Sequence, residues 1–142
     1  VTTMYRTFKG AKALNSELAW DTSKATNMVF TFEGASAFNQ KLAWDTSKVT
    51  NMENMFRETS SDGFNFNQPL AWDTSSVTNM KAMFRLNKIF NRPLAWDTSS
   101  VTNMNEMFYD AKKFNRQLDW DTSKATTTNM FYNARAGAGL TN

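Results

Sequence analysis

The side chains that could do chemistry recur at a nearly constant spacing along the 142-residue chain. One column consists of aspartates, at Asp21, Asp45, Asp73, Asp97 and Asp121. Paired carboxylates can act as acid and base, and stacked carboxylate oxygens can hold calcium. Like charges stacked at the distance between neighbouring strands would repel one another, however, unless each carboxylate is engaged in hydrogen bonds within its own turn. Because each aspartate is followed by Thr-Ser, we favour an Asx turn, in which the carboxylate accepts hydrogen bonds from the backbone just downstream.

A tryptophan stands directly before each aspartate, at Trp20, Trp44, Trp72, Trp96 and Trp120. A ladder of exposed indoles could stack against a carbohydrate. Each tryptophan nevertheless keeps the phase of the leucine two residues earlier, as Trp44 does with Leu42, and such alternation indicates side chains on one face. We therefore expect the indoles to point into the core, with carbohydrate binding as the less favoured alternative.

Asparagine and threonine columns also run through the chain. The asparagines are Asn15, Asn39, Asn67, Asn91 and Asn115 in one column and Asn27, Asn51, Asn79 and Asn103 in the other. The threonines are Thr46, Thr74 and Thr98 in one column and Thr50, Thr78 and Thr102 in the other. In stacked repeats, amides of this kind usually satisfy the backbone of tight turns. The threonines could form a flat ice-binding array, but they lack Thr-x-Thr spacing and suit caps and turns better.

The composition disfavours several functions. The chain has no histidine and no cysteine, so the commonest general base, the commonest metal ligand and thiolate sites are missing. The sequence contains neither a nucleophile–base pair nor a phosphate-binding glycine loop. The net charge of +3 comes from basic residues interspersed with acidic ones, which is weak support for nucleic-acid binding. We predict a protein that is not an enzyme and has no cofactor, metal or nucleic-acid partner.

The columns arise from internal repeats of about 24 residues, because the tryptophans step by 24, 28, 24 and 24 residues. Self-similarity of this kind indicates stacked units. We interpret 1–142 as a single repeat domain and expect it to be a fragment of a longer array, because it begins part-way through a unit. The long step comes from extra residues at about 59–64, whose polar, glycine-containing composition predicts a surface loop. The motif is lost over 133–142, which predicts a frayed end.

Each unit is expected to contain one short strand and one short helix. Met52, Met55 and Phe56 have the i, i+3, i+4 spacing of a helical stripe, and 50–53 has the spacing of a capping box. Leu42 and Trp44 alternate with Ala and Asp, which indicates a strand that stacks on its neighbours about 4.8 Å apart in a parallel sheet. The sequence thus predicts an α/β solenoid.

The complete unit combines Met-Phe, Phe-Asn-Gln and Trp-Asp-Thr-Ser-x-Val-Thr-Asn-Met. In this it resembles the BspA-like leucine-rich-repeat surface proteins, in the variety found in mycoplasma and other microbial surface proteins. The resemblance covers roughly residues 1–132. It implies a leucine-rich-repeat-like stack, a location at the cell surface or outside the cell, and a role in adhesion or protein binding. The sequence given shows no signal segment and no membrane span.

Binding is expected where the units differ, at exposed positions after each Phe and each Phe-Asn pair. These positions are locally basic in the last units. The candidate binding surface consists of Arg57, Arg85, Lys88, Arg92, Tyr109, Lys112, Lys113 and Arg116. It could be a solvated face without a partner or a patch for an anionic or acidic protein. We predict a scaffold that binds a protein or neighbouring repeats of its own array; the alternative is a structural or linker subunit of a large multiprotein assembly.

Overall fold

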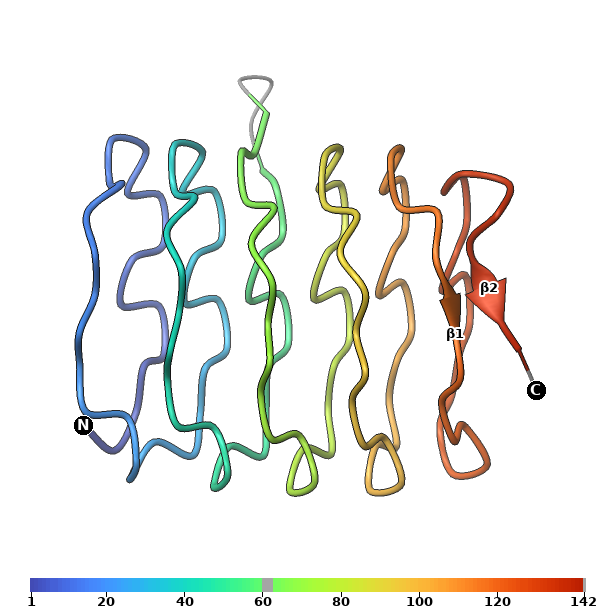
Figure 1. Ribbon diagram of the computed structural model, residues 1–142, viewed down its shortest axis with the longest axis horizontal. Helices are drawn as coiled ribbons and strands as arrows, with labels where there is room; N and C mark the ends of the chain where they lie inside the picture. Colours follow the sequence, from blue (N-terminus) through green and yellow to red (C-terminus); the bar gives the residue numbers. More distant parts are fainter. Residues whose placement is uncertain (60–62, 142) are drawn as a thin grey trace.

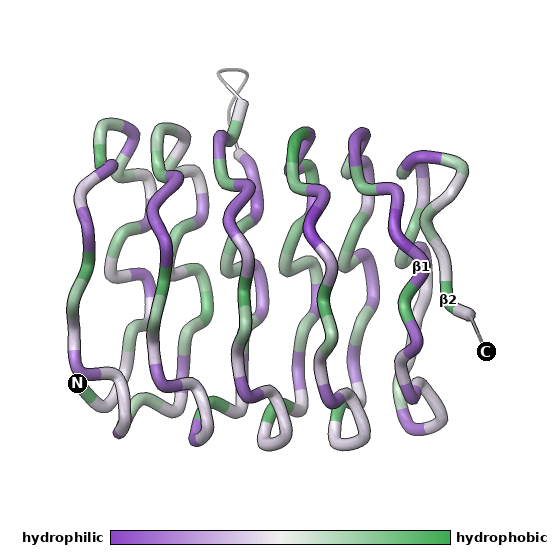
Figure 2. The backbone as a smooth tube through the Cα atoms, in the orientation of Figure 1, coloured by the Kyte–Doolittle hydropathy of each residue, from purple (hydrophilic) through white to green (hydrophobic). Residues whose placement is uncertain are grey.

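The protein is a stack of similar coils, placed side by side along one axis (Figure 1). The structure is a computed structural model that describes residues 1–59 and 63–141. Parallel bridges join one residue of each coil to the next, in the order Thr3, Asn27, Asn51, Asn79, Asn103 and Thr126. The two termini lie at opposite ends of the stack. Hydrophilic and hydrophobic stretches recur at the same height in successive coils (Figure 2), as near-identical repeats require.

The helix predicted in each unit is absent, because no helix occurs in residues 1–59 and 63–141. Asn54 has φ of 55°, which interrupts right-handed helical backbone. The Asn54 and Phe56 N–H groups donate to Lys81 and Met83 of the next coil, both at 2.9 Å, instead of to their own turn. The segment is a chain of turns bonded to its neighbours. We call this side of the stack, which includes 51–58, the turn side.

The capping box predicted at 50–53 is wrong for the same reason. The Thr50 hydroxyl donates to the Thr26 carbonyl of the preceding coil at 3.2 Å. The Asn51 side-chain oxygen accepts the Glu53 N–H at 3.0 Å, which closes a local turn. The apolar stripe nevertheless faces inward as predicted, since Met52, Met55 and Phe56 are all buried.

The strand predicted at Leu42 and Trp44 is also wrong. The only strands in the described residues are β1, Gln117–Leu118, and β2, Gly139–Leu140, which pair in parallel. On the side of the stack that includes 38–44, here called the extended side, side chains bridge the coils: Trp44 Nε1 donates to the Leu18 carbonyl at 2.9 Å. The α/β solenoid, and with it the strand-and-helix architecture of a leucine-rich repeat, is therefore the wrong fold class.

Aromatic columns connect the coils on the extended side. The ring centroids of Phe38 and Phe66 are 6.0 Å apart, and those of Phe66 and Phe90 are 6.2 Å apart. Adjacent strands of a sheet lie only about 4.7–4.9 Å apart. The ring separations exceed this strand spacing, and on this side stacked rings and side-chain hydrogen bonds join the coils in place of a continuous backbone ladder.

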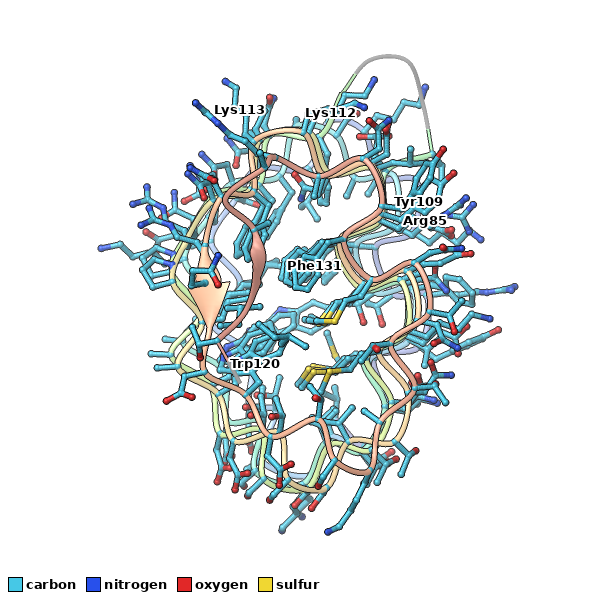
Figure 3. All side chains as sticks on the ribbon, turned by 90° about the vertical axis from the view of Figure 1, so that its right-hand side faces the viewer. Arg85, Tyr109, Lys112, Lys113, Trp120 and Phe131 are labelled. Carbon is cyan, nitrogen blue, oxygen red and sulfur yellow. The ribbon has the colours of Figure 1, made fainter. Side chains whose placement is uncertain are left out.

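The core runs through the middle of the coils, where rings and methionine side chains fill the interior (Figure 3). One phenylalanine column consists of Phe32, Phe56, Phe84, Phe108 and Phe131, with near-parallel neighbouring rings 5.5 or 5.6 Å apart. Trp44, Trp72, Trp96 and Trp120 are buried, which confirms the inward assignment for these four indoles. Trp20, in the first coil, is 41% exposed.

Two irregular stretches were expected in the chain. The surface loop predicted at about 59–64 falls mainly on residues 60–62, which lie outside the described residues. Phe64 and Phe66 directly after it are buried, and Phe66 continues the aromatic stacking. Within 133–142, β2 pairs with β1 of the preceding coil. Gly139 and Leu140 therefore lie against the stack, and the fraying of this end stays a prediction.

Candidate binding surface

The aspartate column is engaged in local turns. Asp73 Oδ1 accepts the Ser75 hydroxyl at 2.6 Å and the Ser75 N–H at 3.0 Å. These two hydrogen bonds lower the pKa of the Asp73 carboxyl. A serine N–H bonds in the same way to the aspartates of the other units, Asp21, Asp45, Asp97 and Asp121. The predicted Asx turns are confirmed, and no group of three or more potential metal-ligating residues occurs in the part of the chain that the structure describes.

The asparagine columns satisfy backbone groups in two different ways. Asn39 Oδ1 accepts the Asn67 N–H of the next coil at 3.0 Å, and Asn67 Oδ1 accepts the Asn91 N–H at 2.9 Å. In the second column, Asn79 Oδ1 accepts the N–H of Lys81, two residues on, at 3.0 Å. The predicted role in tight turns is confirmed for the second column, whereas the first column bonds to the backbone of the next coil. Their side-chain oxygens hold the backbone and are thereby engaged within the chain.

The threonine columns also connect coils. The buried Thr46 hydroxyl donates to the Asp73 carbonyl of the next coil at 2.8 Å, and the Thr74 hydroxyl donates to Asp97 at the same distance. The exposed Thr78 hydroxyl donates to the Thr50 carbonyl at 3.2 Å. These hydroxyls bridge neighbouring coils, where caps and turns were predicted, and they are not presented as an unengaged array.

The candidate binding surface divides into two parts. Arg57, Arg85 and Tyr109 lie on the turn side, where the last two project from the wall in Figure 3. The Arg85 guanidinium pairs with Glu106 at 3.0 Å and lies 4.9 Å from the centre of the Tyr109 ring. The Tyr109 ring stacks on Tyr132 at 4.8 Å. These side chains form a ladder between coils, so much of their binding capacity is used within the molecule.

Arg57 belongs to a second ladder that the sequence did not reveal. Glu33 is only 4% exposed and pairs with Arg57 at 3.4 Å and with Lys9 at 2.6 Å. The three residues occupy the position after Phe in three successive units, with charges that alternate in sign. That alternation is the signal that could have identified the ladder. Removal of either cation would destabilise the stack, because the buried Glu33 carboxylate would lose part of its charge compensation.

The remaining five candidate residues lie along the edge where the turn side passes into the extended side. They are Lys88, Arg92, Lys112, Lys113 and Arg116, and all are exposed. Lys112 and Lys113 point away from the stack in Figure 3. Lys112 pairs with Asp110 at 2.6 Å. Arg135 of the last coil occupies this edge too; sequence reasoning missed it because its unit lacks the Phe-Asn motif.

The extended side carries shallow hollows between coils. One of about 580 Å³ is lined by Trp20, Lys41, Ala43 and Trp44, among others. Of these two indoles only Trp20 is substantially exposed, so the tryptophan column does not present a ladder for stacking against a sugar. Within 1–59 and 63–141, no helix has the length and apolar character needed to cross a bilayer.

These features define a repeat domain of stacked coils, whose recurring polar columns are structural and whose unit-to-unit differences lie on the outside. The chain belongs to the family described as "Mycoplasma protein of unknown function, DUF285", which matches residues 1–65 and 43–140. The overlapping matches accord with a repeated unit. No curated protein and no solved structure matches the chain. The family match supports the mycoplasma resemblance, while the finer BspA-like assignment is not confirmed by it.

Proposed function

We propose that the protein is a non-enzymatic repeat scaffold for protein binding or adhesion at a cell surface. The observation that supports this is the division between a uniform interior and a variable exterior. Buried positions repeat the same residue type, as Met52, Met80 and Met104 do. The outward position after the Phe-Asn pair changes from Gln68 to Arg92 and Arg116 in successive units. A rigid frame that presents different side chains at regular intervals suits recognition, because its surface is pre-organised.

The proposed surface location rests on the resemblance to BspA-like surface proteins and on membership of a mycoplasma family. It is tested by brief protease treatment of intact source cells, followed by detection of the protein. Digestion on intact cells, with a cytosolic marker left whole, is the expected result. Protection until the cells are lysed would overturn the proposed location.

Binding is tested with beads that carry the folded chain, incubated with cells and with purified extracellular proteins. The matched control is the Phe84→Ala variant, because Phe84 is buried and stacks against both Phe56 and Phe108. We expect the folded chain to retain ligands that the destabilised chain does not. Equal retention by both would contradict a function that depends on the coil stack.

A further inference from the structure

Positive charge is concentrated in the last coils, along the edge where the turn side passes into the extended side. We define the basic edge as Lys88, Arg92, Lys112, Lys113, Arg116 and Arg135, all of them exposed. In the segments 86–93, 110–117 and 133–137 that carry them, Asp110 is the single carboxylate. These segments therefore hold a net charge of +5, whereas the whole chain carries +3. The rest of the chain is net negative by two charges, so the basic edge is a local concentration and does not reflect the overall composition.

Asp110 neutralises only part of this edge. Its carboxylate contacts Lys112 at 2.6 Å and accepts a hydrogen bond from the Asn133 amide at 2.5 Å. The pKa of Asp110 is lowered chiefly by the hydrogen bond from Lys112, and the charge of Lys88 acts in the same direction. Asp110 thus pairs with Lys112 alone, and the arginines of the edge have no acidic partner among the described ion pairs.

The arginines are held in a defined orientation. Arg92 Nε donates to the Asn67 carbonyl of the preceding coil at 2.7 Å. Arg116 donates to the Asn91 carbonyl from Nε at 3.3 Å and from Nη2 at 3.1 Å. Each guanidinium is thereby anchored on one side, and its remaining N–H groups are available for a ligand. Such anchoring reduces the conformational entropy that binding would cost.

Glutamines perform the same bridging elsewhere in the stack without a charge. Gln40 Nε2 donates to the Asn15 carbonyl at 2.9 Å, and Gln68 Nε2 donates to the Asn39 carbonyl at 3.1 Å. The bridge between coils therefore does not need an arginine. What Arg92 and Arg116 add is an outward positive charge at equivalent positions of successive coils.

The geometry of the edge favours an extended acidic protein segment as its partner. Phe90 and Phe114, two residues before the arginines, have ring centroids 6.2 Å apart, which indicates the step between equivalent side chains at this edge. Alternate side chains of an extended strand are about 6.6 Å apart, so carboxylates at every second residue would match that step. Guanidinium groups bind carboxylates in a planar, bidentate manner. Single-stranded nucleic acid would need exposed rings for base stacking, and Phe90 and Phe114 are buried.

We infer that the basic edge binds an extended acidic segment of a partner protein, with Arg92 and Arg116 as its main contacts. This inference rests on the proposed binding function and names the chemistry of the partner. A protein segment with Asp or Glu at alternate positions, aligned along the stack axis, would place successive carboxylates on successive coils.

The test uses residues 1–142 and a fluorescent peptide of about ten residues with alternating Glu and Thr, extended as strands are. In the R92Q/R116Q double variant, glutamine keeps the bridge seen for Gln40 and Gln68 and removes two charges. The K24Q/K48Q variant removes two charges directly after the Asp-Thr-Ser turns of two units and serves as the matched control. Thermal melts establish that both variants are folded. We expect about tenfold weaker binding for R92Q/R116Q only, as for the loss of two charge-assisted contacts.

Equal weakening in both double variants would overturn the inference, because it would indicate a response to net charge alone. Tighter binding of an oligothymidylate or of anionic vesicles than of the peptide would also overturn it. The converse variant Q40R/Q68R extends the arginine row to the preceding coils, and we expect it to strengthen peptide binding. If cells bind R92Q/R116Q beads as well as the parent, the inference fails while the proposed function stands. If peptide binding behaves as expected but the protein is protected in intact cells, the surface function fails alone.

Discussion

Each buried tryptophan is both a core residue and a polar bridge. The Trp72 indole is 6% exposed, stacks on Trp96 at 6.4 Å, and donates from Nε1 to the Leu42 carbonyl at 3.0 Å. The alternation of Leu and Trp predicted the burial. It does not predict the hydrogen bond, because in the predicted sheet the Leu42 carbonyl would accept a backbone N–H of a neighbouring strand. The recurrent tryptophan thus supplies a hydrogen bond between coils that the predicted sheet would have made with backbone groups.

Replacing Trp72 with alanine should cost about 3–5 kcal/mol of unfolding free energy, because it leaves a cavity and an unpaired carbonyl. The matched control is Trp20→Ala, since Trp20 is 41% exposed, and a much smaller loss is expected there. Urea denaturation of both variants provides the measurement. Equal losses, or a Trp72→Ala protein as stable as the parent, would contradict the burial of the indole column.

The aspartates of the Asx turns should make the protein sensitive to acid. The pKa values of Asp21, Asp45, Asp73, Asp97 and Asp121 are lowered by the serine hydrogen bonds. A carboxyl with a lowered pKa in the folded state contributes stability above its unfolded pKa of about 3.9, and this contribution disappears as the pH falls through the folded pKa. We therefore expect the melting temperature to be level above about pH 5 and to fall below about pH 4.

Ser75→Ala provides the control for this pH dependence. The variant removes the hydroxyl that donates to Asp73 at 2.6 Å and keeps the backbone donor. The pKa of Asp73, followed by NMR titration, should rise toward its ordinary value, and the acid-dependent loss of stability should become shallower. An unchanged Asp73 pKa would show that the hydroxyl contact does not operate in solution.

At the scale of the element, the sequence predicted which side chains face inward but not the path of the backbone between them. Met52, Met55 and Phe56 are buried as expected, yet a chain of turns satisfies their spacing as well as a helix does. The decisive feature is positive φ at a recurring position of the coils, four residues before a second such position in most of them. It falls on Phe30, Asn54, Ala82 and Glu106 in successive units, residue types with no shared turn signal. Their backbone conformation depends on hydrogen bonds to neighbouring coils, which a single unit cannot reveal.

Asn129 offers a direct test of this backbone, since its φ is 55° and its side chain is exposed. Valine there should cost about 1–2 kcal/mol, because a β-branched residue is strained in left-handed conformation. Thr128→Val next to it should have little effect, since Thr128 is exposed and is not among the positive-φ residues. If the segment were a helix, either valine would lower the unfolding free energy by a similar, small amount. Unfolding free energies that are equal for the two variants would therefore favour the helical alternative.

At the scale of the whole molecule, the two end coils present complementary hydrogen-bonding rows. Within the stack, N–H groups of one coil donate to carbonyls of the next along the turn side, as Met104, Glu106, Phe108 and Asp110 do to the last coil. The corresponding carbonyls of the first coil are those of Thr3, Tyr5, Thr7 and Lys9. The corresponding N–H groups of the last coil are those of Thr127, Asn129, Phe131 and Asn133. Neither row takes part in a backbone hydrogen bond between coils of the described residues.

A polypeptide of residues 1–142 should therefore associate head to tail. Two copies would pair the last coil of one with the first coil of the other, and such a heterologous contact continues into filaments unless rotation closes it. Sedimentation velocity over a concentration series should show a rising mean mass. Trp20→Lys places a charge on the exposed face of the first coil and should shift the distribution toward monomer. Ala71→Lys adds the same charge at an exposed position in the middle of the stack and should not. A monomer at every concentration, or equal effects of the two lysines, would contradict association through the ends.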